Sequence, residues 1–208
     1  MSDEREKHED GTFKKEVFYS ERGLCEFVEY IEKAKESLIG QVIHINTDKF
    51  GSPVEVAMTY NSTYNESILS FVNNINTKDH GTHVQGFRRA LTRTLKKYAD
   101  DNKLLEKAKI EVNPEDFREG LTAVVSVKVA EPQFEGQTKG KLGNSEVQGI
   151  VDKAVSECLE AFLEENPTQA KMIVDKVILA AKARTAAAHA RQLVQRKSPL
   201  SGGGMPGK

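Results

Sequence analysis

The chain has 208 residues, of which 38% are hydrophobic and 29% charged, so it can bury the core of one domain with an appendage. No window approaches the roughly 18 to 20 consecutive apolar residues of a membrane span, and the polar opening MSDEREKHED lacks the apolar stretch of a secretory signal. This composition excludes a fibrous or membrane-spanning protein, and we expect a cytoplasmic protein with no membrane partner.

The net charge of −1 conceals an asymmetry between the two ends of the chain. Residues 1–36 carry eleven acidic and seven basic side chains, whereas residues 167–208 carry eight Lys and Arg side chains against Asp175 alone. The C-terminal end is therefore the one suited to a polyanion.

The first part of the chain predicts a tail, a helix and part of a sheet. Residues 1–17 form a polar tail that is too highly charged to pack. Apolar side chains at positions i, i+3, i+4 and i+7 predict a helix over 23–36 with one buried stripe. The runs QVIHINT and PVEVAMTY flank the turn DKFGS and predict a hairpin, and ESILSFV at 66–72 continues the sheet.

A loop and a basic helix follow. The segment NNINTKDHGTH, 73–83, is rich in turn formers, and it leads into a helix predicted over 84–98. One face of this helix is apolar and most of the remainder is basic. The basic side chains are Arg88, Arg89, Arg93, Lys96 and Lys97. Such a face is commonly only solvated, but few acidic residues intervene here, which also favours a phosphate-facing role.

Two further strands, KIEVN and LTAVVSVKVA, complete the predicted α+β domain. The segment PEDFREG joins them, and its Pro114 can open a single helical turn. Alternate side chains of the second strand, from Ala123 to Val129, point into the core, and the opposite face is partly covered. The sheet therefore carries apolar side chains on both faces.

The loop EGQTKGKLGNSE, 135–146, stands directly ahead of a helix predicted over 145–165. In one interpretation the loop is a solvated turn that leads to an N-cap at Asn144 or Ser145. In the other, three polar side chains reach out of the domain to touch an anion that the domain does not itself hold. These side chains are Gln137, Thr138 and Lys139.

A long helix is predicted over 167–197, because Asn166 and Pro167 form an N-cap and a first-turn proline and no breaker follows. At 1.5 Å per residue it would extend about 45 Å. Its second half has little apolar bulk, so we interpret it as a strut between modules. Residues 198–208 are Gly-rich and predict a flexible linker.

The sequence gives little support for a metal site, a disulfide or a catalytic cysteine. Cys25 and Cys158 lie far apart in predicted helices without ligand-type neighbours, so we expect buried free thiols. Asp79, His80 and His83 could form a metal site, but no fourth ligand is in view. We therefore predict a loop role for these three residues and no metal.

Several phrases, in unbroken order from about Phe18 to the last residue, resemble one family. They are FVEYI (27–31), EVAMTYN (55–61), FVNNINT (71–77), GTHVQGFRRALTRTLKKY (81–98), DFREGLTAVVSVKV (116–129), PQFEGQTKGKLGNSEV (132–147) and the closing RKSPLSGGGMPGK. The patterns GTHxxGFRxAxTR, REGLxAVxSVK and QTKxKLxxxEV are the most specific. This order resembles the transducer region of DNA gyrase B subunits, and topoisomerase IV B subunits are similar over the same stretches.

The resemblance implies an ATP-driven type II DNA topoisomerase, in which two B and two A subunits pass one double-stranded DNA through a break in another. In gyrase this reaction introduces negative supercoils into closed circular DNA. An N-terminal ATPase domain of the GHKL class binds ATP with Mg²⁺, and a TOPRIM domain follows the transducer. The transducer fold is similar to the second domain of ribosomal protein S5, which makes residues 18–166 the transducer domain.

The resemblance also implies roles for single residues. Gln137 and Lys139 of the QTK loop, with Thr138 between them, would contact the γ-phosphate of ATP held by the neighbouring ATPase domain. A lysine there stabilises charge in the transfer and senses whether the phosphate is still present. Arg88 would face the cavity that holds the transported DNA, where phosphate contacts bind without reading sequence.

Two departures from the family pattern matter. The chain lacks the ATPase motifs and the acidic cluster of the cleavage domain, so we expect a fragment that does not hydrolyse ATP alone. His80 stands where the family usually has the first of two glycines, and it is mildly strained if that position needs a positive φ.

Two other classes of protein stay open at the level of the sequence. A stand-alone S5-like nucleic-acid-binding module would use the same basic helix but has no need of Gln137 and Lys139 at a fixed place. The second domain of a MutL-like mismatch-repair ATPase also delivers a lysine to a γ-phosphate, but it lacks the REGL and PGK phrases found here.

Overall fold

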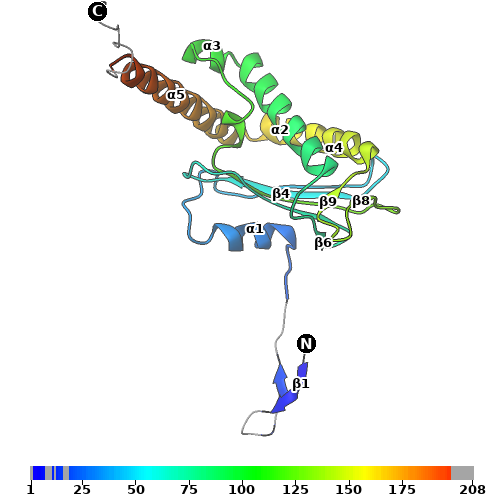
Figure 1. Ribbon diagram of the computed structural model, residues 1–208. Coiled ribbons are helices and arrows are strands. Elements are labelled where there is room, and N and C mark those ends of the chain that lie inside the picture. The colour runs from blue at the N-terminus through cyan, green and yellow to red at the C-terminus, as the bar shows by residue number, and fades with distance from the viewer. Residues whose placement is uncertain (1, 8–10, 12, 16–18, 198–208) are drawn as a thin grey trace, which may run out of the picture.

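The computed structural model describes the backbone of residues 2–7, 11, 13–15 and 19–197, and the side chains of residues 19–194 (Figure 1). The predicted linker at 198–208 lies outside the described residues. So do residues 1, 8–10, 12 and 16–17 of the predicted N-terminal tail.

The N-terminal segment is not a plain tail. Strands β1 (Ser2–Lys7) and β2 (Phe13–Lys15) pair antiparallel, with Ser2 opposite Lys15. This pair lies apart from the main sheet and its helices in Figure 1. The composition correctly argues against burial in a core, but two strands need no core to pair their backbone N–H and C=O groups with each other. The predicted tail is therefore wrong in local structure.

The main sheet has five strands in the order β3-β4-β7-β5-β6. Their bounds are Ile43–Thr47 (β3), Val54–Tyr60 (β4), Ser67–Val72 (β5), Ile75–Asn76 (β6) and Leu121–Val127 (β7). The predicted hairpin is confirmed, with Ile43 opposite Met58. All neighbouring strands run antiparallel except β5 and β7, which run parallel. The predicted 73–83 loop is interrupted by β6.

Helices cover both faces of this sheet (Figure 1). Helix α1 (Leu24–Glu32) lies on one face, and helices α2 (Thr82–Asp101) and α4 (Ser145–Glu165) lie on the other. The alternation predicted in β7 is confirmed, because Ala123 and Val125 enter the large core with α2 and α4, whereas Val124 joins the smaller cluster with α1. The fold is the expected α+β class with a mixed sheet.

The predicted helix bounds are only partly right. Helix α1 ends four residues before the predicted 36, and Lys35 then turns back to bond the carbonyl of Glu32. Helix α2 extends the predicted 84–98 at both ends, whereas α4 has the predicted bounds.

The predicted strand KIEVN is wrong. Helix α3 (Leu104–Ala108) precedes it, and the C-cap residue Lys109 adopts a left-handed conformation with φ 50. The backbone beyond bonds to side chains instead of to a neighbouring strand: the Asn113 N–H donates to Asp116, and the Glu111 carbonyl accepts from Arg184. The helical turn predicted after Pro114 is present as the short helix η1 (Asp116–Arg118).

Helix α5 (Pro167–Lys197) confirms the predicted long helix and its starting proline. Its first half is packed on the domain through buried residues such as Ile173 and Val177, whereas residues 182–194 are all exposed. In the described part of the chain, no helix is both long and apolar enough to cross a membrane. Two short strands, β8 (Phe134–Glu135) and β9 (Lys141–Leu142), form a separate hairpin ahead of α4.

Candidate functional site

The QTK segment forms the tip of the β8–β9 hairpin. Phe134 lies opposite Leu142, Glu135 lies opposite Lys141, and residues 136–140 make the turn. Gly136 and Lys139 both have positive φ, 78 and 54, which allows the chain to reverse within so few residues. The predicted loop is therefore a structured hairpin.

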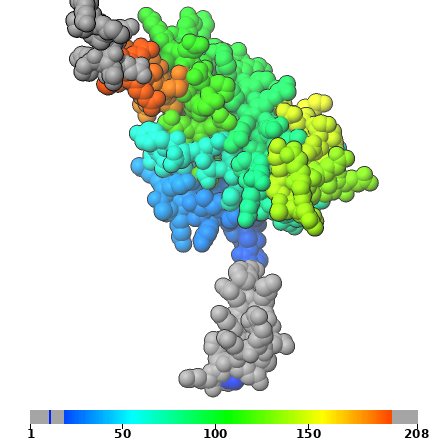
Figure 2. All heavy atoms as spheres, in the orientation of Figure 1, coloured from blue at the N-terminus to red at the C-terminus, as the bar shows by residue number. Residues whose placement is uncertain are grey.

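Three polar side chains are exposed together at this tip, as the second interpretation of the loop requires. They are Gln137, Thr138 and Lys139. The hairpin projects from the side of the domain in Figure 1, and the yellow-green atoms of this region protrude in the same place in Figure 2. The tip is therefore accessible from outside the domain.

The base of the hairpin is fastened to the loop ahead of α2. The Leu142 N–H donates to the His80 carbonyl at 3.0 Å, and the Asp79 N–H donates to the Gly140 carbonyl at 2.9 Å. Gly81, with φ 135, forms a parallel bridge with Leu142. A Cβ atom at Gly81 would lie 2.5 Å from the backbone nitrogen of Leu142, so only glycine permits this approach.

His80 and His83 lie beside this junction and use their rings in hydrogen bonds. His80 has φ 62, the positive value anticipated for a position where the family usually has glycine, and its Nδ1 lies 3.1 Å from Ser70 Oγ. His83 is fully buried with Nε2 3.2 Å from Thr77 Oγ1. Burial, with a smaller contribution from His80, lowers the pKa of His83 to about 4. Across the described residues no three His, Cys, Asp or Glu side chains are grouped to hold a metal.

Asn144 occupies the predicted N-cap position of α4, but its side chain does not cap the helix. Its Oδ1 accepts from the Gln133 N–H at 2.6 Å, and its Nδ2 donates to the Glu131 carbonyl and the Glu146 carboxylate. The side chain thus ties the segment that enters the hairpin to the helix that leaves it. The N-cap signal locates the residue but not this role.

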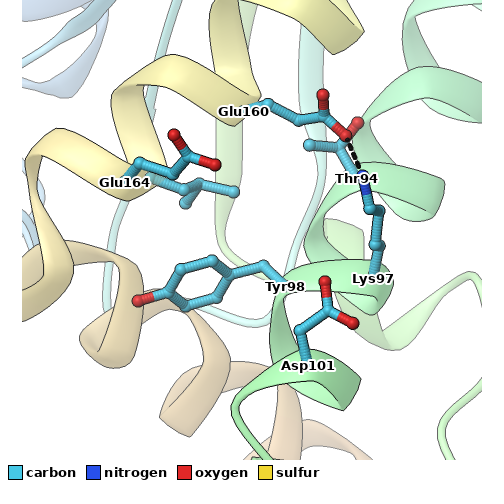
Figure 3. A pocket seen from close by; sticks show the side chains of 7 residues that line it. Thr94, Lys97, Tyr98, Asp101, Glu160 and Glu164 are labelled. Carbon is cyan, nitrogen blue, oxygen red and sulfur yellow. Dashed lines mark hydrogen bonds and ion pairs between the residues drawn. The ribbon is translucent and has the colours of Figure 1, made fainter.

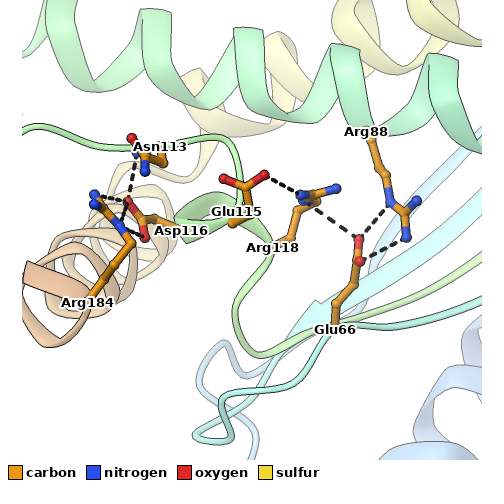
Figure 4. A network of polar contacts seen from close by, with 7 residues as sticks. All are labelled: Glu66, Arg88, Asn113, Glu115, Asp116, Arg118 and Arg184. Carbon is orange, nitrogen blue, oxygen red and sulfur yellow. Dashed lines mark hydrogen bonds and ion pairs between the residues drawn. The ribbon is translucent and has the colours of Figure 1, made fainter. Parts of the chain in front are cut away.

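The basic residues of α2 are paired with carboxylates. The half-buried Arg88 makes a bidentate contact with Glu66, with Nε–Oε1 at 2.9 Å and a terminal nitrogen 2.8 Å from Oε2 (Figure 4). Arg118, just ahead of β7, lies 3.9 Å from the same carboxylate. The remaining pairs, all exposed on the basic side, are Arg89 and Arg93 with Asp152, Lys96 with Asp100, and Lys97 with Glu160.

Most of these acidic partners come from elsewhere in the chain, Asp152 and Glu160 from α4 and Glu66 from the position just before β5. Counting the acidic residues within the α2 segment could not reveal these partners. Helical spacing along 145–165 could have found the α4 partners, because Asp152 and Glu160 recur at a distance of about two turns. The prediction that the five basic residues face DNA stays a prediction.

A small cavity of about 50 Å³ lies between the C-terminal halves of α2 and α4 (Figure 3). It is lined by Thr94, Lys97, Tyr98, Asp101, Glu160, Leu163 and Glu164. This volume is far below the roughly 300 Å³ of even a small ligand site. Thr94 also lies twelve residues, or roughly 18 Å along the helix, from the junction with the hairpin. The cavity is therefore neither a nucleotide pocket nor part of the hairpin site.

The fold and the hairpin together define an α+β domain that presents an exposed polar tip. The family DNA gyrase B matches residues 23–193, and the chain belongs to this family. It is similar to the B subunit of DNA gyrase from Cytophaga aurantiaca, with 62% identity over the whole chain and 44% of that relative. The B subunit of DNA gyrase from Cytophaga hutchinsonii is 60% identical over the same shares. The chain thus spans less than half the length of these curated relatives.

Solved structures agree with the family. The crystal structure of the 43K ATPase domain of Thermus thermophilus gyrase B, in complex with an aminocoumarin, matches with a TM-score of 0.81 and 39% identity. That match covers 87% of this chain and 49% of that one. The topoisomerase IV ATP binding domain of Francisella tularensis matches with a TM-score of 0.71 and 30% identity, over 83% of this chain and 46% of that one.

Proposed function

We propose that the chain is the transducer part of the B subunit of DNA gyrase, an ATP-dependent type II topoisomerase that negatively supercoils DNA. In this proposal residues 18–166 form the S5-like transducer domain and 167–197 the linker helix. The GHKL ATPase domain precedes them, and the TOPRIM domain follows. The higher TM-score and identity of the gyrase B structure support gyrase over topoisomerase IV, which is the alternative.

The observation that carries the proposal is the hairpin with an exposed QTK tip and a fastened base. A solvated surface turn needs neither the Leu142 and Gly140 backbone contacts nor the close approach at Gly81. A group that must contact a ligand in a neighbouring domain needs both a free tip and a rigid base. The arrangement therefore favours a reaching contact over a simple helix cap.

The chemistry of the tip fits the terminal phosphate of a nucleotide. The Lys139 ammonium supplies a positive charge and up to three donors, and the Gln137 amide supplies two more. Mg²⁺ bound with ATP in the preceding domain would neutralise part of the phosphate charge. The tip residues then orient the γ-phosphate and stabilise the charge that develops during its transfer. Loss of that phosphate removes the contact and releases the hairpin.

The base of the hairpin connects a movement of its tip to the rest of the domain. Its backbone bonds reach His80 and Asp79, directly ahead of α2, and its last strand leads into α4. Helix α5 continues from α4 after Asn166 and extends past the domain. A displacement of the tip is thereby passed on to the long helix, which would carry it towards the DNA gate and the gyrase A subunits of an A2B2 complex.

The basic face of α2 is proposed to contact the transported double-stranded DNA. Exposed ion pairs contribute only about 0 to 1 kcal/mol each, so phosphates can replace the exposed carboxylate partners of Lys96 and Lys97 at little cost. The arginines differ, because loss of their contact would leave the half-buried Glu66 or the buried Asp152 unpaired. We therefore expect Lys96 and Lys97 to exchange partners more readily than Arg88, Arg89 and Arg93.

ATP hydrolysis by the complete B subunit carrying Lys139→Ala tests the proposal. We expect turnover to fall at least about tenfold, because a charge that acts in phosphate transfer is lost. The matched control is Lys141→Ala, since Lys141 lies in the same hairpin and its ammonium is held by Glu135 at 3.0 Å. Turnover of this control should stay near that of the parent. Equal turnover in the parent and in Lys139→Ala would mean that the hairpin is only a solvated surface turn.

A further inference from the structure

The hairpin depends on one short loop for its position. Residues 77–81 connect β6 to α2, and they supply the backbone contacts to Gly140 and Leu142 described above. Gly140 directly follows Lys139 in the chain. Whatever fixes the 77–81 loop therefore also fixes the point from which Lys139 extends.

The loop is in turn fixed by a chain of buried polar side chains. Ser70 Oγ on β5 lies 2.7 Å from Thr77 Oγ1 and 3.1 Å from His80 Nδ1, and Thr77 Oγ1 lies 3.2 Å from His83 Nε2. Ser70 Oγ also donates to the Thr77 carbonyl at 2.9 Å. Ser70, Thr77 and His83 are buried, and His80 is half-buried. We call these four residues the loop network.

The proton positions of this network follow from the buried ring of His83. Its Nδ1 has no hydrogen-bond partner within the described residues. A proton on Nδ1 would be a buried donor without an acceptor, which is costly, so the proton lies on Nε2 and is donated to Thr77 Oγ1. The Thr77 hydroxyl can then donate to the Ser70 carbonyl, 3.1 Å away. This leaves the Ser70 hydroxyl free to serve Thr77 or His80.

His80 is the member whose backbone most needs the network. A residue with a Cβ atom at φ 62 is less stable there than glycine, and the surrounding structure must hold it in place. The Ser70 hydroxyl can donate to the neutral ring, and it can accept from the charged ring while donating to the Thr77 carbonyl. The bond to Ser70 therefore persists in both protonation states of His80.

We propose that the loop network is a positioning device for the QTK hairpin, and that His80 is the residue that fixes the base of the hairpin through Ser70. This inference rests on the proposed function for its effect on catalysis, but not for its effect on the hairpin. His80 acts through the loop and the hairpin, so it is a positioning residue that does not touch the nucleotide. A glycine at this position would relax the backbone but lose the side-chain bond.

The first test is hydrogen exchange of backbone amides in the complete B subunit carrying His80→Ala. We expect faster exchange across 139–142, where the Leu142 N–H bonds the His80 carbonyl, and unchanged exchange in β4. The control is His44→Ala, because His44 is exposed on β3 and pairs only with Glu55 among the described residues. His80→Asn should restore part of the protection, since asparagine tolerates positive φ and its amide can bond Ser70.

The second test is steady-state ATP hydrolysis by the same variants. We expect His80→Ala to lower kcat roughly tenfold, within the hundredfold that a misplacement of about 1 Å can cause. Binding of ADP, which lacks the γ-phosphate, should not change. Adding Ser70→Ala to His80→Ala should lower kcat by less than the two single effects combined, because both substitutions remove the Ser70–His80 bond and only Ser70→Ala also removes the bonds to Thr77. A general loss of folding would weaken ADP binding as well.

The outcomes separate this inference from the proposed function. Unchanged exchange at 139–142 in His80→Ala overturns the inference whatever the kinetics show. Faster exchange with a parental kcat, in a protein where Lys139→Ala is impaired, also overturns it. If Lys139→Ala itself has parental turnover, the proposed function fails, and the exchange measurement alone decides whether the network holds the hairpin.

Discussion

His83 shows how one buried side chain sets a condition on the pH at which the protein is stable. Its ring is fully buried, it bonds only Thr77 within the described chain, and its pKa is about 4 instead of 6.5. Between pH 6.5 and 4, His83 is therefore protonated in the unfolded chain but stays neutral in the folded protein. A depressed histidine pKa means that its contribution to stability is present above pH 6.5 and is lost as the pH falls towards 4.

The free energy of unfolding should accordingly fall by about 3 kcal/mol between pH 6.5 and 4 because of His83 alone. His83→Gln keeps a donor for Thr77 but does not titrate, so its curve should lack this component. Denaturant unfolding at several pH values measures the difference between the two proteins, which removes the shared contribution of the carboxylates. Parallel curves for both proteins would contradict a buried neutral His83.

The pairing of α2 with α4 is the main feature at the level of elements. Gly86 lies where α2 closely approaches α4, and a Cβ atom there would lie 3.2 Å from the backbone carbonyl carbon of Gln148 and closer still to its oxygen. On the outer side the Asp152 carboxylate accepts from Arg93. The basic side chains of α2 thus also help to hold α4, which supports the end of the hairpin.

Gly86→Ala should destabilise the protein by about 1 to 3 kcal/mol, because the new methyl group must push the helices apart. The matched control is Gly149→Ala, since Gly149 is exposed on α4 and a Cβ atom there meets nothing within 4 Å. That change should instead stabilise the protein by about 0.5 to 1 kcal/mol through helix propensity. Thermal unfolding of both variants measures whether each change lowers or raises stability. An unchanged stability in Gly86→Ala would contradict the close approach of the two helices.

How much of the structure can be predicted from the sequence depends on the range of the interaction. Helix α4, helix α5 and the β3–β4 hairpin are predicted well because their signals are local periodicity, proline and turn residues. The strand predicted at KIEVN fails because Asp116 accepts from the Asn113 N–H, three residues earlier, and Arg184 donates to the Glu111 carbonyl, 73 residues earlier. The exposed QTK tip is predicted, but its fastened base depends on residues about 60 positions earlier, which no local pattern reveals.

At the scale of the molecule, polar contacts join helix α5 to the domain in addition to its apolar packing, and those of Arg184 and Lys176 involve buried groups. Arg184 bonds the buried Asp116 of η1 through two of its nitrogens, at 3.0 and 2.9 Å (Figure 4). Lys176 is buried and donates to the carbonyls of Ser62 and Thr63. Arg184 is the last of these contacts before the exposed end of the helix, so it sets where the free end begins.

If the proposed function holds, Arg184→Ala in the complete gyrase should uncouple ATP use from DNA passage without stopping either. We expect the ATP hydrolysed per supercoil introduced to rise by roughly fivefold, because the helix no longer follows the domain closely. Arg191→Ala is the control, since Arg191 is exposed further along the same helix. Supercoiling and phosphate release measured in one reaction give the ratio, and a parental ratio would show that Arg184 only stabilises the fold.

The strand order has a consequence for how the domain assembles during synthesis. Strand β7 lies between β4 and β5, yet it leaves the ribosome after both, separated from β5 by the whole of α2 and α3. Until β7 is available, β3–β4 and β5–β6 are two unconnected hairpins, each exposing an edge that belongs in the middle of a sheet. The five-stranded sheet is complete only when β7 pairs with both β4 and β5. Until then the exposed edges of β4 and β5 in the nascent chain can pair with other strands and aggregate.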